Sequence, residues 1–186
     1  MKGFNVKVEN VVAFTALGNN VPLNKIVASV ENAEYEPEHF PGLVYRISQP
    51  KSAALIFSSG KIVCTGTKSI QDAKAAVAKV VEMMRGAGIQ VPGNYKVSVE
   101  NMVASTKLDA QINLEEMTFS LENAEYEPEQ FPALIYRITD PRVAFLLFGS
   151  GKIICTGAQS IEDIHKALGK LMSSLEAIGI KARPAG

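Results

Sequence analysis

The sequence is poor in the residues that usually build metal centres and disulfide scaffolds. It contains two cysteines, two histidines and no tryptophan in 186 residues. His39 is expected in a loop and His165 on the polar face of a helix, so a metal cluster is not expected. Cys64 and Cys155 occupy equivalent points of two similar segments, which indicates reduced, packed thiols. We therefore expect a protein without cofactors.

Motifs of catalysis are missing as well. The Gly-Lys pairs that begin at Gly60 and Gly151 are each followed by isoleucine, and they lack the first glycine of a phosphate-binding loop. The two cysteines are expected to face the core, which does not suit a nucleophile. The sequence therefore predicts a protein that is not an enzyme.

Net charge and long apolar runs are also lacking. Nineteen basic residues balance nineteen acidic ones, so the chain lacks the overall basic charge that usually marks nucleic-acid binding. No apolar run approaches the length of a membrane span, and the N-terminal MKGFNVKVEN lacks the core of a signal peptide. These absences predict an intracellular protein with no membrane association.

What the sequence does contain is an internal duplication. Val8-Glu9-Asn10 recurs as Val99-Glu100-Asn101, and GKIVCTG from Gly60 recurs as GKIICTG from Gly151, both with the same offset (99 − 8 and 151 − 60). An ungapped repeat of this kind indicates duplicated structural units. We predict two repeats, residues 1–91 and 92–186, joined by the turn-like residues 90–94.

The residue pattern predicts four strands and two helices in each repeat. Ser69 is expected to begin a long helix, with Asp72 three residues later as in a capping box, and Ser160 and Asp163 repeat this arrangement. Tight turns between strands imply antiparallel pairing, with the helices on one side. In the first repeat the expected strands cover residues 7–17, 43–47, 53–57 and 61–65. The expected helices cover residues 23–30 and the segment after Ser69, whose apolar stripe comprises Ile70, Ala73, Val77, Val80 and Met84. The second stripe comprises Ile161, Ile164, Leu168, Leu171 and Leu175.

The sheet face away from these helices is unexpectedly apolar. In the strand at 61–65, Ile62 and Cys64 share one face, whereas Val63 and Thr65 share the other. Because the helices cover only one face, the second face would present apolar side chains to water, and a surface of that size is usually a binding site. Burial of this face in a homodimer or against another layer is the alternative.

Three motifs recur in both repeats: Y-E-P-x-x-F-P from Tyr35 and Tyr126, F-x-S-G-K-I-x-x-T-G from Phe57 and Phe148, and V-E-N-x-V-A from Val8 and Val99. With them, nearly the whole chain closely resembles the conserved core of the TATA-box-binding protein family, in its archaeal form. The resemblance implies an α+β fold, a pseudo-twofold saddle of two tandem repeats. Its curved, ten-stranded antiparallel sheet would carry four helices on the convex face. It also implies a general transcription initiation factor whose concave face binds the minor groove of TATA-box promoter DNA and bends it.

Matching motif to motif, the resemblance assigns DNA contacts of four kinds. The wedges inserted between base pairs would be Phe40, Phe57, Phe131 and Phe148. The hydrogen bonds to base edges would come from Asn10, Asn101, Thr65 and Thr156. The apolar floor of the groove would contact Val12, Val63, Val103 and Ile154, with Leu55 and Leu146 beside the wedges. The positions at or near phosphates would be Arg46, Arg137, Lys61, Lys152, Ser59, Ser150 and Lys68.

The resemblance also implies partners and a location. The loop with Glu127, Glu129 and Gln130 would face transcription factor B (TFIIB-like), and RNA polymerase would join indirectly. The first-loop acids Glu34 and Glu36 are interpreted as solubilising, and Glu38 and His39 have no assigned role. A weak homodimer through the concave face is a further expectation, and the compartment would be the cytoplasm and nucleoid in an archaeon or the nucleus in a eukaryote.

Two departures from the family pattern stand out, and two other functions are weighed. Lys68 has only Gln159 as its counterpart, and Phe14 replaces a residue that is usually small. Phe14 would be either an extra apolar contact or a packing residue, and we favour packing. The alternative functions are an apolar-ligand or protein-binding scaffold that uses the same face, and a DNA-repair enzyme. The enzyme would need a catalytic domain for which no residues remain.

Overall fold

The computed structural model describes residues 3–186, which form ten strands and four helices. The chain clusters into two compact units. One is Asn10–Glu100, here called the first half, and the other combines Asn101–Gly186 with residues 3–9, here called the second half. The predicted α+β class, with two repeats, ten antiparallel strands and four helices, is confirmed. The repeat boundary at residue 91 stays a prediction.

Each half arranges five strands in the same order. In the first half the order is β2-β3-β4-β5-β1, and in the second it is β7-β8-β9-β10-β6, with antiparallel neighbours. The first set is β1 (Lys7–Ala16), β2 (Ala33–Glu34), β3 (Leu43–Ser48), β4 (Lys51–Ile56) and β5 (Lys61–Thr67). The second set is β6 (Ser98–Lys107), β7 (Ala124–Glu125), β8 (Ala133–Thr139), β9 (Arg142–Phe148) and β10 (Lys152–Ala158). The helices are α1 (Leu23–Ser29), α2 (Ile70–Gly86), α3 (Leu114–Ser120) and α4 (Ile161–Ala177).

The long helices begin where the capping residues predicted. The Ser69 hydroxyl oxygen accepts from the Asp72 backbone N–H at 3.0 Å, and Ser160 accepts from Asp163 at 3.0 Å. Such caps satisfy backbone donors that the first turn of a helix leaves free. The expected apolar stripes are buried from Ala73 and Ile164 onward, whereas Ile161, at the first position of α4, is 39% exposed.

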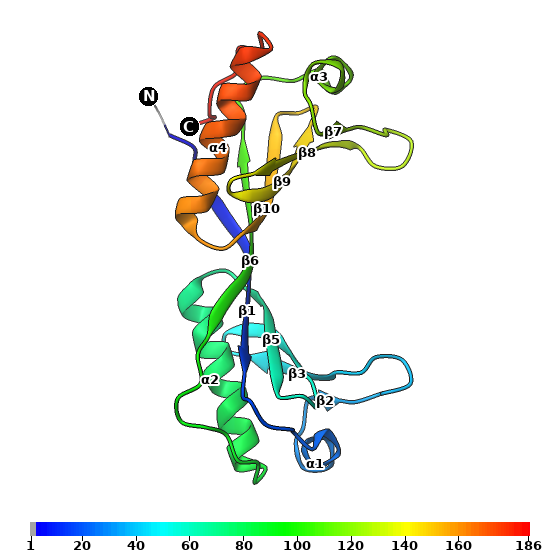
Figure 1. The fold of residues 1–186 in the computed structure, drawn as a ribbon, viewed down its shortest axis with the longest axis vertical. Coiled ribbons are helices and arrows are strands. Elements are labelled where there is room, and N and C mark those ends of the chain that lie inside the picture. Colours follow the sequence, from blue (N-terminus) through cyan, green and yellow to red (C-terminus); the bar gives the residue numbers. More distant parts are fainter. Residues whose placement is uncertain (1–2) are drawn as a thin grey trace. The chain divides into compact units, whose positions relative to one another are not determined.

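Each long helix covers one face of its strands (Figure 1). In β5, Ile62 and Cys64 are fully buried, whereas Val63 and Thr65 between them are half-buried. The strands β4, β9 and β10 alternate in the same way. Side chains of successive strand residues point to opposite faces, so one face of each half packs against its helix and the other does not. The predicted facing of the strands is confirmed.

The short strands β2 and β7 were not predicted by the residue pattern, which gave four strands per repeat. Each follows an asparagine with positive φ, Asn32 at 62° and Asn123 at 59°. Asparagine tolerates this left-handed conformation better than most residues. Two residues cannot display an alternation, so the pattern contained no signal for these strands. Among residues 3–186, no helix is long and apolar enough to cross a membrane.

Candidate nucleic-acid interface

The sheet face turned away from the long helix is lined by half-buried side chains in each half. Strand register aligns Val44, Leu55, Val63 and Phe14 across β3, β4, β5 and β1. The second half aligns Ile135, Leu146, Ile154 and Ser105 across β8, β9, β10 and β6. We call this surface the open face. Its first-half members are Asn10, Val12, Phe14, Val44, Leu55, Phe57, Val63 and Thr65. Its second-half members are Asn101, Val103, Ser105, Ile135, Leu146, Phe148, Ile154 and Thr156, and all sixteen are half-buried.

An asparagine is held in one orientation on each open face. Asn10 Oδ1 accepts from the Gly66 backbone N–H at 2.8 Å, and Asn10 Nδ2 donates to Thr65 Oγ1 at 3.1 Å. Since the amide oxygen is occupied by a backbone donor, the amide N–H₂ group is the part left to meet a ligand. The open face therefore presents a fixed hydrogen-bond donor beside a threonine hydroxyl.

The second half repeats this arrangement. Asn101 Oδ1 accepts from the Gly157 N–H at 2.7 Å, and Asn101 Nδ2 donates to Thr156 Oγ1 at 3.4 Å. The register of β10 against β6 shifts between Thr156 and Ala158, at Gly157. The corresponding glycine, Gly66, has φ of 100°, and Gly157 has φ of 103°, conformations that residues with a Cβ rarely adopt. The glycines thus aim their N–H groups at the asparagines.

Two phenylalanines meet at the edge of each open face. The rings of Phe40 and Phe57 are 5.9 Å apart between centroids and 68° apart in plane, and those of Phe131 and Phe148 are 6.3 Å and 67° apart. These are edge-to-face geometries, which aromatic pairs favour. Phe40 is 39% and Phe131 43% exposed. Each half therefore presents a pre-formed pair of rings, one of them exposed over about two fifths of its surface.

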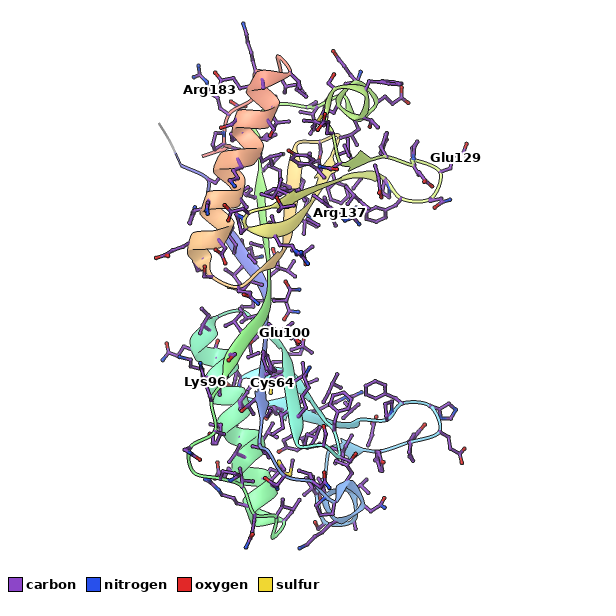
Figure 2. All side chains as sticks on the ribbon, viewed as in Figure 1. Cys64, Lys96, Glu100, Glu129, Arg137 and Arg183 are labelled. Carbon is purple, nitrogen blue, oxygen red and sulfur yellow. The ribbon has the colours of Figure 1, made fainter. Side chains whose placement is uncertain are left out.

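The loops before β3 and β8 fix the exposed rings from the backbone side. The Phe40 N–H donates to the Glu36 carbonyl at 3.0 Å, and the Phe131 N–H donates to the Glu127 carbonyl at 2.9 Å. Glu127, Glu129 and Gln130 are all exposed, and Figure 2 shows Glu129 at the outer end of its loop. The second loop thus offers acidic and amide side chains next to the wedge candidate.

Comparison with known proteins agrees with this geometry. The family model described as transcription factor TFIID (or TATA-binding protein, TBP) matches residues 5–87 and again residues 96–178. The chain belongs to this family. It is 48% identical over 182 residues to the TATA-box-binding protein of Archaeoglobus fulgidus, covering 97% of this chain and 100% of that protein. It is 47% identical over 180 residues to that of Methanothermobacter thermautotrophicus, covering 97% and 99%. The solved structure of Methanococcus jannaschii TBP superposes with a TM-score of 0.85 at 47% identity, covering 92% of this chain and 98% of that one.

In this TATA-binding-protein fold, the predicted phosphate contacts lie at the margins of the open face, and several are held by carboxylates. Arg46 Nη2 lies 3.8 Å from Glu34, and Arg137 Nη1 lies 3.5 Å from Glu125. Exposed pairs of this kind contribute about 0–1 kcal/mol, so a phosphate can replace the carboxylate at little cost. Five further predicted contacts are exposed: Ser59, Ser150, Lys61, Lys152 and Lys68.

The interpretation of Phe14 as a packing residue is wrong. Phe14 faces Val63 across the β1–β5 pair and is half-buried on the open face, whereas its neighbours Ala13 and Thr15 are buried. The Lys61 Nζ lies 5.4 Å from the centroid of the Phe14 ring. The alternation of β1 places Phe14 on the same side as Val12, so the residue adds to the apolar surface.

The cysteines lie on the helix side of the sheet, as predicted. Cys64 and Cys155 are free thiols, 0% and 2% exposed. Burial raises the pKa of each thiol to about 12, because the thiolate would lose its hydration. A thiol that stays protonated is a poor nucleophile. Within residues 3–186, no three His, Cys, Asp or Glu side chains are grouped as metal ligands would be.

Besides Phe14 and its counterpart Ser105, four residues of the interface were missed from the sequence. Gly66 and Gly157 orient the asparagines, and Val44 and Ile135 complete the apolar rows. The Thr-Gly step in both copies of the T-G motif was the available signal for the glycines, because a glycine inside a strand often marks a bulge. Alternation along residues 43–47 was the signal for Val44.

Proposed function

We propose that this protein is a general transcription initiation factor that binds the minor groove of TATA-box DNA through the open face and bends it. The observation that supports this most is the open face itself. In each half a row of apolar side chains lies beside one oriented asparagine and ends at a pair of phenylalanines, one of them exposed. The names of the family and of its relatives point to the same activity.

The chemistry of the open face favours A·T pairs. The minor groove of A·T pairs carries only acceptors, adenine N3 and thymine O2, whereas guanine adds an amino donor. The fixed N–H₂ groups of Asn10 and Asn101 suit those acceptors. The apolar rows offer nothing to a guanine amino group, and a buried donor without a partner costs about 1–3 kcal/mol. Sequence preference would thus arise largely by exclusion.

The exposed rings suit insertion between base pairs. Phe40 and Phe131 are held by their loops and already contact Phe57 and Phe148, so little ordering is needed on binding. Apolar wedges unstack a base step and bend the duplex so that more protein surface is buried, a trade for which TATA-box-binding proteins are themselves a standard example. Flexible TA steps lower the cost of this deformation.

Neutral net charge is compatible with this proposal. Arg46, Arg137, Lys61 and Lys152 edge the open face and would meet phosphates. Much of the binding free energy would come from buried apolar area rather than from counterion release.

The partners are part of the proposal. Glu127, Glu129 and Gln130 would contact basic residues of transcription factor B, which would recruit RNA polymerase in turn. These side chains are exposed on a loop whose backbone is fixed, as a docking site requires. The activity is one of binding, without a catalytic step, in an intracellular setting where promoter DNA is present.

A gel-shift comparison tests the proposal. A TATA-type duplex should be retarded at concentrations at which a duplex with G·C pairs in the same positions is not. Equal affinity for both would contradict the proposal and leave the apolar-ligand or protein scaffold as the better reading. A gel assay of bending tests whether the protein bends the DNA. The TATA sequence is placed at the centre or at the end of a DNA fragment, and a bent complex migrates differently for the two placements.

A further inference from the structure

The open faces of the two halves are chemically alike at every matched position but one. The pairs of identical or similar residues in the two halves are Asn10 with Asn101, Val12 with Val103, Val44 with Ile135, Leu55 with Leu146, Phe57 with Phe148, Val63 with Ile154 and Thr65 with Thr156. The exception is Phe14, whose counterpart is Ser105. A phenyl ring and a hydroxyl group differ in what they can bind in the minor groove, because only the hydroxyl oxygen accepts hydrogen bonds.

Phe14 presents a purely apolar surface. It lies opposite Val63, in the row that continues to Leu55, so it widens the apolar strip of the first half. Lys61 Nζ lies 5.4 Å from the ring centroid and 3.6 Å from Glu100 Oε1. The cation is thus shared between the ring and the carboxylate, which restrains both. No acceptor on the Phe14 side chain can meet a donor from the DNA.

Ser105 presents an acceptor at the matched place. It lies opposite Ile154, and its hydroxyl donates to Glu9 Oε1 at 2.7 Å. With its hydrogen used in that bond, the hydroxyl oxygen keeps its lone pairs for a donor. Glu9 Oε1 also lies 3.8 Å from Lys7 Nζ, so the carboxylate is balanced by that cation, and the acceptor offered to a donor is the Ser105 hydroxyl oxygen.

We infer that Phe14 and Ser105 make the first half more selective for A·T pairs than the second half. This difference in selectivity decides the orientation in which the protein binds its site. The inference rests on the proposed minor-groove binding. A G·C pair places the guanine amino group in the minor groove. Beneath Phe14 that donor is left without a partner, whereas beneath Ser105 it can donate to the hydroxyl oxygen. A site with one G·C pair is therefore bound with Ser105 over that pair.

Orientation can be read directly by tethered cleavage. Glu38, an exposed residue of the first loop to which no binding role is assigned, is replaced by cysteine and labelled with an iron chelate that cuts nearby DNA. The native thiols, Cys64 and Cys155, are buried, so the unsubstituted protein treated with the same reagent is the control and should give no cuts. The DNA is a set of symmetric A·T duplexes, each with a single G·C pair at a different position of one half.

With the native residues at positions 14 and 105, at least one duplex of the set should be cut mainly beside its unsubstituted half. The bias should be about tenfold, as expected from the lower part of the range for an unsatisfied donor. Phe14→Ser should abolish the bias. The double swap Phe14→Ser with Ser105→Phe should reverse it. Both positions are half-buried outside the core, so the swap leaves the core packing in place, although it removes the Ser105–Glu9 hydrogen bond and the contact between Lys61 and the Phe14 ring.

Three results would overturn the inference: equal cutting of both halves throughout the duplex set, a bias that survives Phe14→Ser, or one that keeps its direction in the double swap. In each of these the symmetric A·T duplex is still bound, so the proposed function stands. If the symmetric duplex and a G·C-substituted one bind equally, the proposed function has failed, and this inference fails with it.

Discussion

Asn10 and Gly66, which are far apart in the sequence, are joined on the open face by a hydrogen bond of 2.8 Å from the glycine N–H to the asparagine Oδ1. The bond exists because β5 carries an irregularity at this glycine, whose φ of 100° turns its N–H out of the regular ladder. The same relationship links Gly157 and Asn101 at 2.7 Å. Backbone geometry therefore decides which end of the amide is free of the backbone donor, and the proposed sequence preference would depend on a glycine that orients the asparagine.

Replacing Gly66 by alanine should destabilise the protein. The new Cβ would lie 3.3 Å from the Ser52 Cα, and the positive φ is strained for any residue with a Cβ. Strain of this type costs about 1–3 kcal/mol. Gly86→Ala is the matched control, because nothing lies within 4 Å of a Cβ at that helix-end position. Urea unfolding should give a lower midpoint for Gly66→Ala and an unchanged or higher one for Gly86→Ala. Equal midpoints would show that the β5 irregularity is not under strain.

Replacing Phe131 by alanine should reduce the bend angle of bound DNA, while the free energy of unfolding of the protein should change little. The ring is 43% exposed, so the folded protein loses little packing, whereas the bent complex loses a wedge. Phe119→Ala is the control, since Phe119 is 93% exposed on α3 and outside the open face. The bend angle can be measured by energy transfer between dyes at the ends of a TATA duplex. A bend unchanged in Phe131→Ala would remove Phe131 from the wedge set, and Phe40→Ala tests the first half in the same way.

Replacing Arg46 by glutamine should weaken binding to all duplexes by a similar factor. Its guanidinium is exposed and lies 3.8 Å from Glu34 in a solvent-exposed ion pair, so it is available to a phosphate. Loss of one phosphate contact should lower the slope of log affinity against log salt by about 1. Lys79→Gln, on the exposed side of α2 in the same half, removes the same charge away from the open face. Titrations at several salt concentrations separate the two variants. An unchanged slope in Arg46→Gln would place Arg46 outside the phosphate contacts.

Much of the fold was predictable because local patterns decide it. Ser69 and Ser160 predicted the starts of α2 and α4, and the alternation around Val63 and Cys64 predicted the two faces of β5. The Asn10–Gly66 bond was not predictable, because it depends on a register shift between strands far apart in the chain. Phe14 was misjudged for a different reason. Packing was favoured over an apolar contact for this residue, although alternation with Val12 already places it on the open face. The roles in DNA binding that the family resemblance assigns to individual residues stay predictions.

The two buried thiols should make stability fall at alkaline pH. The pKa values of Cys64 and Cys155 are raised to about 12 in the folded protein from an ordinary value of 9.0. A raised folded pKa contributes stability that is complete below the unfolded pKa and is lost as pH rises towards the folded one, because only the unfolded thiols ionise in between. The free energy of unfolding should therefore decline between pH 9 and about pH 12.

The variant with Cys64→Ala and Cys155→Ala isolates this effect from the other groups that titrate in the same range. Its absolute stability will be lower because of the volume removed from the core, but its pH slope should be smaller than that of the native chain. Alkylation gives an independent reading. At pH 9 the native thiols should react at least roughly five hundredfold more slowly than unfolded ones, since the reactive thiolate is scarce in the folded protein and shielded from the reagent. Equal slopes in the two proteins, together with rapid alkylation of the folded chain, would show that these thiols are open to solvent.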